Sequence, residues 1–405
     1  MTTAELTNTF RSIETADVKG KRVIVRTDLN VPMSGEQVAD ATRIERLVPT
    51  LQGLSRRGAK VIVLSHLGRP DGTVDLRYSL RPVADKLASL MNGTPVRFSD
   101  DCVGPVASAE VERAREGEVV VMENVRFHGG EEANDPSFAR ELARHGDIYV
   151  NDAFSVSHRA HASTEAIARF LPSYAGPSMM AEIDAFKLAL DRPERPVAAI
   201  VGGSKVSTKI DVLVNLARRM DYLFIGGGMA NTFLFVQGFN VGKSLHEPGF
   251  AATVDQIMSQ AAESGCRIVL PVDAVVAREF AAGVPSKAVP VSDVPADAMI
   301  LDIGPRSVAE FTQRLEACKT LLWNGPVGAF EVPPFGEGTF ALARAVVGMT
   351  RSGRLVTVAG GGDTVAALNA AGVTNDFSYV STAGGAFLEW LEGRTLPGVA
   401  ALLQA

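Results

Sequence analysis

The chain has 405 residues, of which 46% are hydrophobic and 21% charged, so it is long enough for two globular domains with large cores. Its formal net charge of −6 at pH 7 argues against nucleic-acid binding as the main role, because that usually needs a basic excess. The three cysteines are far apart and in no metal-ligand spacing, which is typical of a reducing compartment and argues against a disulfide framework.

The N-terminal residues show no basic segment followed by an apolar one, so we expect neither a signal peptide nor a membrane span. Beyond them, short β-branched runs alternate with longer amphipathic segments. This alternation predicts an α/β fold of Rossmann-like lobes, each a parallel sheet flanked by helices. The predicted strands are residues 23–25, 61–64, 119–121, 148–150, 197–201, 223–225, 268–270, 299–301, 321–323 and 355–358.

A domain boundary is predicted between the first four strands and the rest. Residues 179–190 have the pattern of a helix, and residues 191–196 form a polar stretch with two prolines. We therefore expect an N-terminal lobe over 1–178, a hinge helix and linker over 179–196, and a C-terminal lobe over 197–393.

Basic residues follow each strand of the first half. In open parallel sheets, ligands bind beyond the carboxyl ends of the strands, so these positions are candidates for a site. A single arginine of this kind is more often a surface residue or a salt-bridge partner. Five at one edge indicate a site for a small, multiply negative molecule, because guanidinium groups bind phosphate and carboxylate bidentately. The five are Arg26, Arg43, Arg69, Arg126 and Arg159.

Glycine turns follow the strands of the second half. Residues 202–210 predict a glycine turn into a helix with Lys205 and Lys209 on one face. Either both lysines point to solvent or an anion binds near them, and the turn leaves both interpretations open. Asn324 and Glu331 follow the strand at 321–323. Repeated glycines indicate close approach of the backbone to a nucleotide along this edge.

The stretch 356–367 reads as a strand, a glycine turn and a helix start. Gly360, Gly361 and Gly362 allow backbone N–H groups to approach a phosphate closely. Asp363 would repel a polyphosphate unless a cation lay between them, so it is a candidate magnesium ligand. The alternative is that Asp363 is the N-cap of the helix, which is the commoner role for such a residue.

Two apparent motifs carry no function. Residues 238–244 resemble a P-loop but have three residues between the glycines where four are needed, so we expect a surface loop. Residues 201–204 lack the spacing of a dinucleotide-binding turn, which argues against a dehydrogenase.

Seven blocks together resemble the phosphoglycerate kinase family, in that family's order over essentially the whole chain. They are residues 26–32, 65–70, 123–128, 158–161, 202–206, 323–326 and 360–364. The resemblance implies a two-lobed monomer in the cytoplasm that transfers a phosphoryl group between 1,3-bisphosphoglycerate and Mg-ADP, giving 3-phosphoglycerate and ATP in glycolysis and gluconeogenesis. It implies no nucleic-acid or membrane partner.

The resemblance also implies roles for single residues. In the family, the N-terminal lobe holds the glycerate and the C-terminal lobe holds the nucleotide. Glycerate binding would fall to Asp28, Leu29, Asn30, Arg43, His66, Leu67, Gly68, Arg69, Arg126 and Arg159. Nucleotide binding would fall to Lys209, Asn324, Glu331, Gly360, Gly361, Gly362, Asp363 and Thr364, with Asp363 on magnesium. Arg26, Lys205 and Lys209 would neutralise the phosphoryl group in transfer, and residues 394–405 would pack back on the N-terminal lobe.

No residue presents itself as a general base, which agrees with this reaction because the acceptor carboxylate is already ionised at neutral pH. Closure about residues 179–196 is the motion expected to shape the rate. Four positions depart from the family's usual residues, namely Ser155, Val156, Ile300 and Ala383. The competing hypothesis is a two-lobed binding protein without turnover, which would have no use for Arg26, Lys205, Lys209 and Asp363 together.

Overall fold

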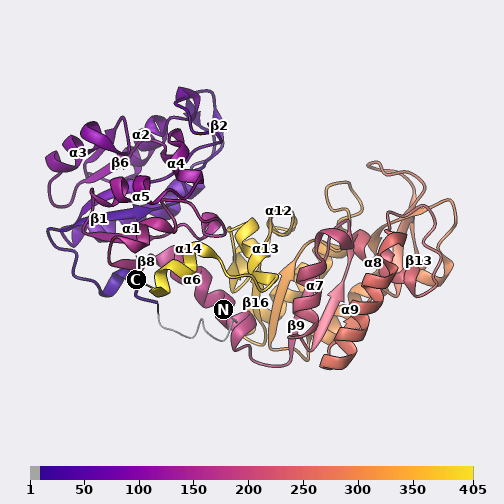
Figure 1. The fold of residues 1–405 in the computed structure, drawn as a ribbon. Helices are drawn as coiled ribbons and strands as arrows, with labels where there is room; N and C mark the ends of the chain where they lie inside the picture. The colour runs from indigo at the N-terminus through magenta and orange to yellow at the C-terminus, as the bar shows by residue number, and fades with distance from the viewer. Residues whose placement is uncertain (1–9, 405) are drawn as a thin grey trace. The chain divides into compact units, whose positions relative to one another are not determined.

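The structure is a computed structural model that describes residues 10–404. The chain forms two compact units, drawn in Figure 1. The N-terminal unit comprises the chain up to Ile183 together with the segment from Thr395 onward, and the C-terminal unit is Asp184–Arg394. The division falls within helix α6 (Pro177–Phe186), inside the segment expected as hinge and linker. The expectations for residues 1–9, including the absent signal peptide, and for residue 405 lie outside the described residues.

A six-stranded parallel sheet organises the N-terminal unit, in the order β5-β6-β4-β1-β7-β8. The four strands predicted here are confirmed as β1, β4, β6 and β7. The other two escaped prediction because β5 mixes polar and apolar residues and β8 has only three residues. The bounds are β1 (Arg22–Arg26), β4 (Lys60–Leu64), β5 (Val96–Ser99), β6 (Val119–Met122), β7 (Ile148–Asn151) and β8 (Ser173–Ala175), with a hairpin of β2 (Met33–Ser34) and β3 (Gln37–Val38).

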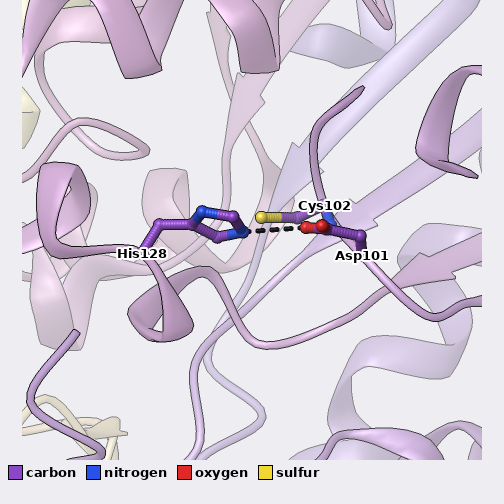
Figure 2. Close-up of side chains that lie close together, drawn as sticks. All are labelled: Asp101, Cys102 and His128. Carbon is purple, nitrogen blue, oxygen red and sulfur yellow. Dashed lines mark hydrogen bonds and ion pairs between the residues drawn. The ribbon is translucent and has the colours of Figure 1, made fainter. Parts of the chain in front are cut away.

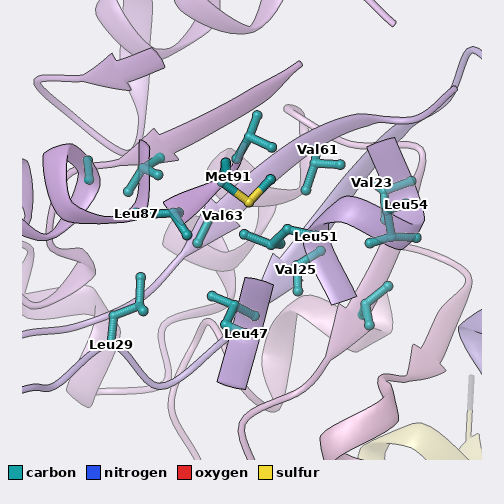
Figure 3. Packing of buried hydrophobic residues seen from close by; sticks show 14 of the residues in the cluster. Val23, Val25, Leu29, Leu47, Leu51, Leu54, Val61, Val63, Leu87 and Met91 are labelled. Carbon is teal, nitrogen blue, oxygen red and sulfur yellow. The ribbon is translucent and has the colours of Figure 1, made fainter. Parts of the chain in front are cut away.

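Apolar side chains from helices and from the central strands form the core of this unit (Figure 3). Helix α1 (Thr42–Arg56) buries Leu47, Leu51 and Leu54, whose spacing places them on one face. They pack in the same cluster as Val23 of β1 and Val61 of β4. This packing holds the sheet rigid, so the residues after its strands have defined positions.

The helices of the N-terminal unit include the last one in the chain, α14 (Pro397–Gln404). Gly398 donates its backbone N–H to Ser157 O at 2.9 Å, and its carbonyl accepts from Asn151 Nδ2 at 3.2 Å. These bonds tie the last helix to the end of β7. The remaining bounds are α2 (Arg81–Leu90), α3 (Gly104–Arg113), α4 (Gly129–Glu132) and α5 (Pro136–Ala143).

The C-terminal unit has its own six-stranded parallel sheet, in the order β11-β10-β9-β15-β16-β17. A separate antiparallel sheet has the order β13-β12-β14. The prediction that residues 299–301 belong to a parallel sheet is therefore wrong, because an apolar run does not reveal its pairing partner. The bounds are β9 (Val197–Val201), β10 (Tyr222–Ile225), β11 (Arg267–Val269), β12 (Asp273–Ala277), β13 (Ser286–Pro290), β14 (Met299–Ile303), β15 (Thr320–Asn324), β16 (Val356–Ala359) and β17 (Tyr379–Val380).

Helices cover the parallel sheet of this unit, and α6 continues into a π-helical stretch, Lys187–Asp191. The ring of Phe186 stacks on Trp390 with centroids 4.5 Å apart. The other bounds are α7 (Ile210–Ala217), α8 (Gly227–Val236), α9 (Ala251–Ser264), α10 (Pro305–Leu315), α11 (Glu337–Arg351), α12 (Gly362–Ala370) and α13 (Gly385–Leu391). Among the helices of residues 10–404, none is long and apolar enough to cross a membrane.

Candidate active site

Arg26 is the last residue of β1, and its side chain is buried, with 1% of the residue exposed. Its Nε donates to Ser163 Oγ at 2.7 Å, and its terminal nitrogens contact the Thr27 carbonyl and, at 3.3 Å, His66 Nδ1. Burial, reinforced by the charges of Arg26 and Arg126, holds the pKa of His66 well below its usual value. A neutral His66 that accepts at Nδ1 carries its proton on Nε2, where it can be donated to a ligand.

A hydrogen-bonded group joins the loop after β1 to the start of α1. Asp28 Oδ2 pairs with Arg43 NH1 at 2.8 Å, and the same Arg43 nitrogen donates to Asn30 O at 2.8 Å. Asn30 Oδ1 accepts from Gly68 N at 2.9 Å, which ties this loop to the one after β4. Ser155, one of the departures from the family, donates to Asp28 Oδ2 at 2.6 Å and adds to the group.

Arg126 reaches the same loop from the end of β6. Its NH1 donates to Gly68 O at 2.8 Å, and its Nε lies 3.3 Å from Glu132 Oε1 without the alignment of a hydrogen bond. Burial lowers the pKa of Arg126, although a guanidinium remains charged throughout the physiological range. The unit thus holds two buried cations, Arg26 and Arg126, close to a neutral histidine.

The other residues expected to bind the glycerate divide into two groups. The side chains of Leu29 and Leu67 are buried in the unit and have no access to a ligand. Their backbones hold the loops, since Leu29 N donates to Ser65 Oγ and Leu67 O accepts from Asn124 Nδ2. Arg69 and Arg159 are exposed, and the charge of Arg159 acts on Arg126.

Lys209 is the central cation of the C-terminal unit. Its Nζ donates to Gly202 O at 2.7 Å and to Asn324 O at 3.3 Å, so the ammonium lies between the ends of β9 and β15. Gly202 has no room for a side chain, because a Cβ would meet Pro326 O at 1.9 Å. Burial lowers the pKa of Lys209 to about 8, and the charge of Asp363 opposes this shift.

The prediction that Lys205 and Lys209 share a helical face is wrong. A 3-10 turn, Val206–Thr208, separates them, and α7 begins only at Ile210. Lys205 has extended backbone angles and an exposed side chain. The turn therefore leaves Lys205 outside, whereas Lys209 points inward to the strand ends.

The glycine turn after β16 is held by one side chain at the end of β15 and by another in α12. Asn324 Nδ2 and Thr364 Oγ1 both donate to Gly360 O, at 2.9 and 2.8 Å. Thr364 Oγ1 accepts from Gly325 N at 2.7 Å. Asn324 Oδ1 is buried and has no hydrogen-bond partner among the described residues. Two hydrogen bonds thus fix the carbonyl of Gly360, and Asn324 Oδ1 remains an acceptor without a partner among the described residues.

Asp363 is not the N-cap of the helix that follows. Helix α12 begins at Gly362, its N-cap is Gly361, and no side chain caps it. The Asp363 side chain is exposed in the first turn of the helix. Its carboxylate is therefore available to a ligand.

A cavity of about 400 Å³ adjoins these groups within the C-terminal unit. Apolar residues make up much of its wall, and Glu331 and Asp363 also line it. Ile300, another departure from the family, is part of the wall. The apolar lining residues include Leu234, Leu245, Phe280, Met299, Ile300 and Val327. Residues 238–244, expected as a surface loop, form a loop beside it whose Val241 and Ser244 are buried.

Asp101, Cys102 and His128 form a second group of potential ligands in the N-terminal unit, with donor atoms within 4.8 Å of one another (Figure 2). Asp101 Oδ1 already accepts from His128 Nε2 at 2.8 Å and from Cys102 N at 2.7 Å. Burial raises the pKa of the Cys102 thiol well above its usual value, so it is protonated. The three residues are therefore satisfied as a hydrogen-bonded pair beside a buried thiol.

Two important residues of the N-terminal unit were missed by sequence reasoning. Ser163 contacts both Glu131 and Arg26, yet Glu131 and Ser163 each stand beside a motif rather than within it. The sequence signal that could have pointed to them is Glu131, an acidic residue that follows the block 123–128 and has no lysine or arginine at helical spacing to pair with.

Two α/β units, one with buried cations at its strand ends and the other with a lysine among glycine turns, define a class of protein that binds anionic metabolites. The phosphoglycerate kinase family model matches residues 13–394. The chain belongs to the phosphoglycerate kinase family.

Individual relatives agree over nearly their full length. The chain is 58% identical over 394 residues to a phosphoglycerate kinase of Methylorubrum extorquens, covering 97% of this chain and 98% of the relative. It is 55% identical over 397 residues to that of Agrobacterium fabrum, covering 98% and 99%. The structure of phosphoglycerate kinase from Coxiella burnetii matches with a TM-score of 0.91 at 40% identity, covering 98% of this chain and 99% of that one. The two-unit α/β fold and the kinase class predicted from the sequence are thereby confirmed.

Proposed function

We propose that the chain transfers the acyl phosphate of 1,3-bisphosphoglycerate to Mg-ADP, giving 3-phosphoglycerate and Mg-ATP, and that the reaction is reversible. The observation that carries this proposal is the position of the Lys209 ammonium, which is held between the ends of β9 and β15. The negative charge of Asp363 interacts favourably with it. A cation fixed at strand ends beside a free carboxylate suits a phosphate accompanied by a divalent metal.

The N-terminal unit is proposed to bind the glycerate. Arg26 and Arg126 supply charges that stay in place without ligand, because each is held by hydrogen bonds. His66 would donate from Nε2, and the exposed Arg43, Arg69 and Arg159 would close on the phosphate. Asp28 and Asn30 would act chiefly by holding Arg43 and Gly68 in position.

The C-terminal unit is proposed to bind the nucleotide. The apolar part of the 400 Å³ cavity suits a base, and Glu331 on its wall suits a ribose hydroxyl. The turn at Gly360–Thr364 and the start of α12 would face the phosphates.

Asp363 is proposed to hold magnesium together with the nucleotide phosphates. Its exposed, uncapping carboxylate fits this role, since Mg²⁺ is usually held by one or two carboxylates plus phosphate oxygens. When bound, the metal would reduce the negative charge of the phosphates. The protein side chains would then neutralise the remaining negative charge of the phosphates and align the reacting groups.

The chemistry needs no general base. An oxygen of the ADP β-phosphate attacks the phosphorus, the bond from phosphorus to the acyl oxygen breaks, and the glycerate leaves as a carboxylate without moving a proton. Arg26, Lys205 and Lys209 would stabilise the charge on the group in transfer. Closure about residues 179–196 would bring the bound glycerate and nucleotide together and exclude water from the group in transfer.

We further propose that the enzyme acts as a cytoplasmic monomer without a nucleic-acid or membrane partner. The acidic net charge and three unpaired cysteines support this.

The test is a coupled assay of ATP-dependent phosphorylation of 3-phosphoglycerate. We expect the wild type to turn over and Lys209→Ala and Asp363→Ala to lose about a hundredfold or more in kcat. Lys319→Ala is the matched control, because Lys319 is exposed at the opposite end of β15. A silent wild type that still binds both ligands by calorimetry would identify a binding protein and reject the proposal.

A further inference from the structure

Glu131 is a fully buried carboxylate in α4, with 0% of the residue exposed. Both its oxygens are engaged by one residue, since Oε1 accepts from Ser163 Oγ at 2.6 Å and Oε2 from Ser163 N at 2.9 Å. His161 Nδ1 lies 3.9 Å from Oε1, but burial lowers the pKa of His161 to about 4, so that ring is neutral at pH 7. Burial raises the pKa of Glu131, and the positive charge of Arg26 is the largest of the influences that oppose this rise and favour the carboxylate.

The hydrogen bonds between these groups have one permitted direction. Arg26 Nε can only donate, so Ser163 Oγ accepts there at 2.7 Å. The single hydroxyl hydrogen of Ser163 is then left for Glu131 Oε1. The guanidinium of Arg26, the hydroxyl of Ser163 and the carboxylate of Glu131 therefore form a hydrogen-bond relay. The direction of each hydrogen bond in this relay is fixed.

The rest of the Arg26 guanidinium is held by other segments. One terminal nitrogen donates to the Thr27 carbonyl, and the other contacts His66 Nδ1 at 3.3 Å. Each of the three nitrogens thus has a partner of its own. Without the contact at Nε, the plane of the Arg26 guanidinium could rotate about the Cδ–Nε bond. The terminal nitrogen that contacts His66 would then move.

We propose that Ser163 and Glu131 are positioning residues for phosphoryl transfer, which set the plane of Arg26 and balance its buried charge. This inference rests on the proposed function, because it gives Arg26 a part in the reaction. Both residues are 0% exposed, so neither touches substrate. A geometric error in a charged group at the reacting centre is costly, because alignment supplies much of the catalysis in this reaction class.

The first test is Ser163→Ala, which leaves Arg26 Nε without its acceptor. We expect kcat to fall about 10- to 100-fold, with the KM for nucleotide nearly unchanged because that site is on the other unit. Ser163→Thr, which keeps a hydroxyl, should recover most of the loss. The matched control is Ser173→Ala, since Ser173 is equally buried in the same unit and its hydroxyl donates to the carbonyls of Leu171 and Ala168.

A double-mutant cycle separates positioning from a merely structural role. Arg26→Lys removes the Nε donor, so Ser163→Ala should cost little further kcat in that background, whereas a structural defect would cost the same in both backgrounds. Glu131→Gln provides a second route if Ser163→Ala does not fold. An amide can offer only one acceptor to Ser163, so the relay is broken and the same pattern of kcat loss is expected.

Three results would overturn the inference. One is wild-type kcat in folded Ser163→Ala or Glu131→Gln. Another is an equal cost of Ser163→Ala with and without the Arg26 substitution. The third is wild-type kcat in Arg26→Lys, which would remove Arg26 from the mechanism while leaving the transferase activity of the wild type, and so the proposed function, intact.

Discussion

Lys209 Nζ donates a hydrogen bond to Gly202 O, 2.7 Å away. Lys209 directly precedes α7 and Gly202 directly follows β9, so this bond closes the loop between the strand and the helix. A second carbonyl, that of Asn324, lies 3.3 Å from the same nitrogen. Because β9 and β15 are neighbours in the sheet, two strand ends orient one ammonium. A phosphate that binds here meets a cation whose side-chain entropy is already lost.

The first prediction concerns the pH dependence of activity. The pKa of Lys209 is about 8, so the cation is present below that pH and is lost as the pH rises through it. We expect kcat/KM for the nucleotide, which reports the free enzyme, to fall above about pH 8. Lys209→Arg, which stays charged, should remove this inflection even if it lowers the rate. An unchanged high-pH limb in Lys209→Arg would contradict the assignment.

The second prediction concerns magnesium. Asp363→Asn should raise the Mg²⁺ concentration needed for half-maximal rate by about tenfold or more, because the amide lacks the charge that holds the metal. Calorimetry should show weaker binding of Mg-ADP and little change for ADP without metal. Unfolding of the free protein should be nearly unaffected, since Asp363 caps no helix. Identical magnesium titrations for variant and wild type would exclude Asp363 as a ligand.

The third prediction concerns the glycine turn. Gly361 has a φ of +96°, and a Cβ there would lie 2.6 Å from Asn324 Nδ2. Gly361→Ala should therefore destabilise the protein by about 1–3 kcal/mol and displace the amide that holds Gly360. Gly372→Ala is the control, because Gly372 also has a positive φ of +70° but nothing within 4 Å of the added atom. Urea unfolding and ADP calorimetry should show a loss of nucleotide affinity in Gly361→Ala alone.

The fourth prediction concerns acid stability. The pKa of His161 is about 4 in the folded protein against a usual value of 6.5, owing to burial and then to Arg126 and Arg26. Between these pH values the unfolded chain binds the proton more readily, so stability falls as the pH falls through 6.5.

We expect His161 to account for about 2 kcal/mol of lost stability between roughly pH 7.5 and pH 5. His161→Gln should lose less stability than wild type over this interval, as measured by urea unfolding at each pH. The same slope in both proteins would show that His161 is already solvated in the folded state.

Local pattern was sufficient for most of the fold. The whole of β9 and residues 23–25 of β1 are continuous apolar runs, because both faces of their sheets are covered by helices. Where a strand was short or polar, as in β5 and β17, the pattern carried no signal. The residues at 299–301 were recognised as a strand, but their antiparallel pairing with β12 depends on how the chain between the two strands folds back.

For the candidate site, the sequence determined which chemical groups are present and at which end of which strand they stand. Burial, direction and contact were decided only by the tertiary structure. Lys205 and Lys209 look equivalent in sequence, yet one side chain is exposed and the other binds two carbonyls. Glu131 and Ser163 are 32 residues apart, and only the packing of α4 against the loop after β7 brings them to Arg26. The physical reason is that residue type and spacing encode local periodicity, whereas a hydrogen bond between distant segments depends on how the whole sheet and its helices pack.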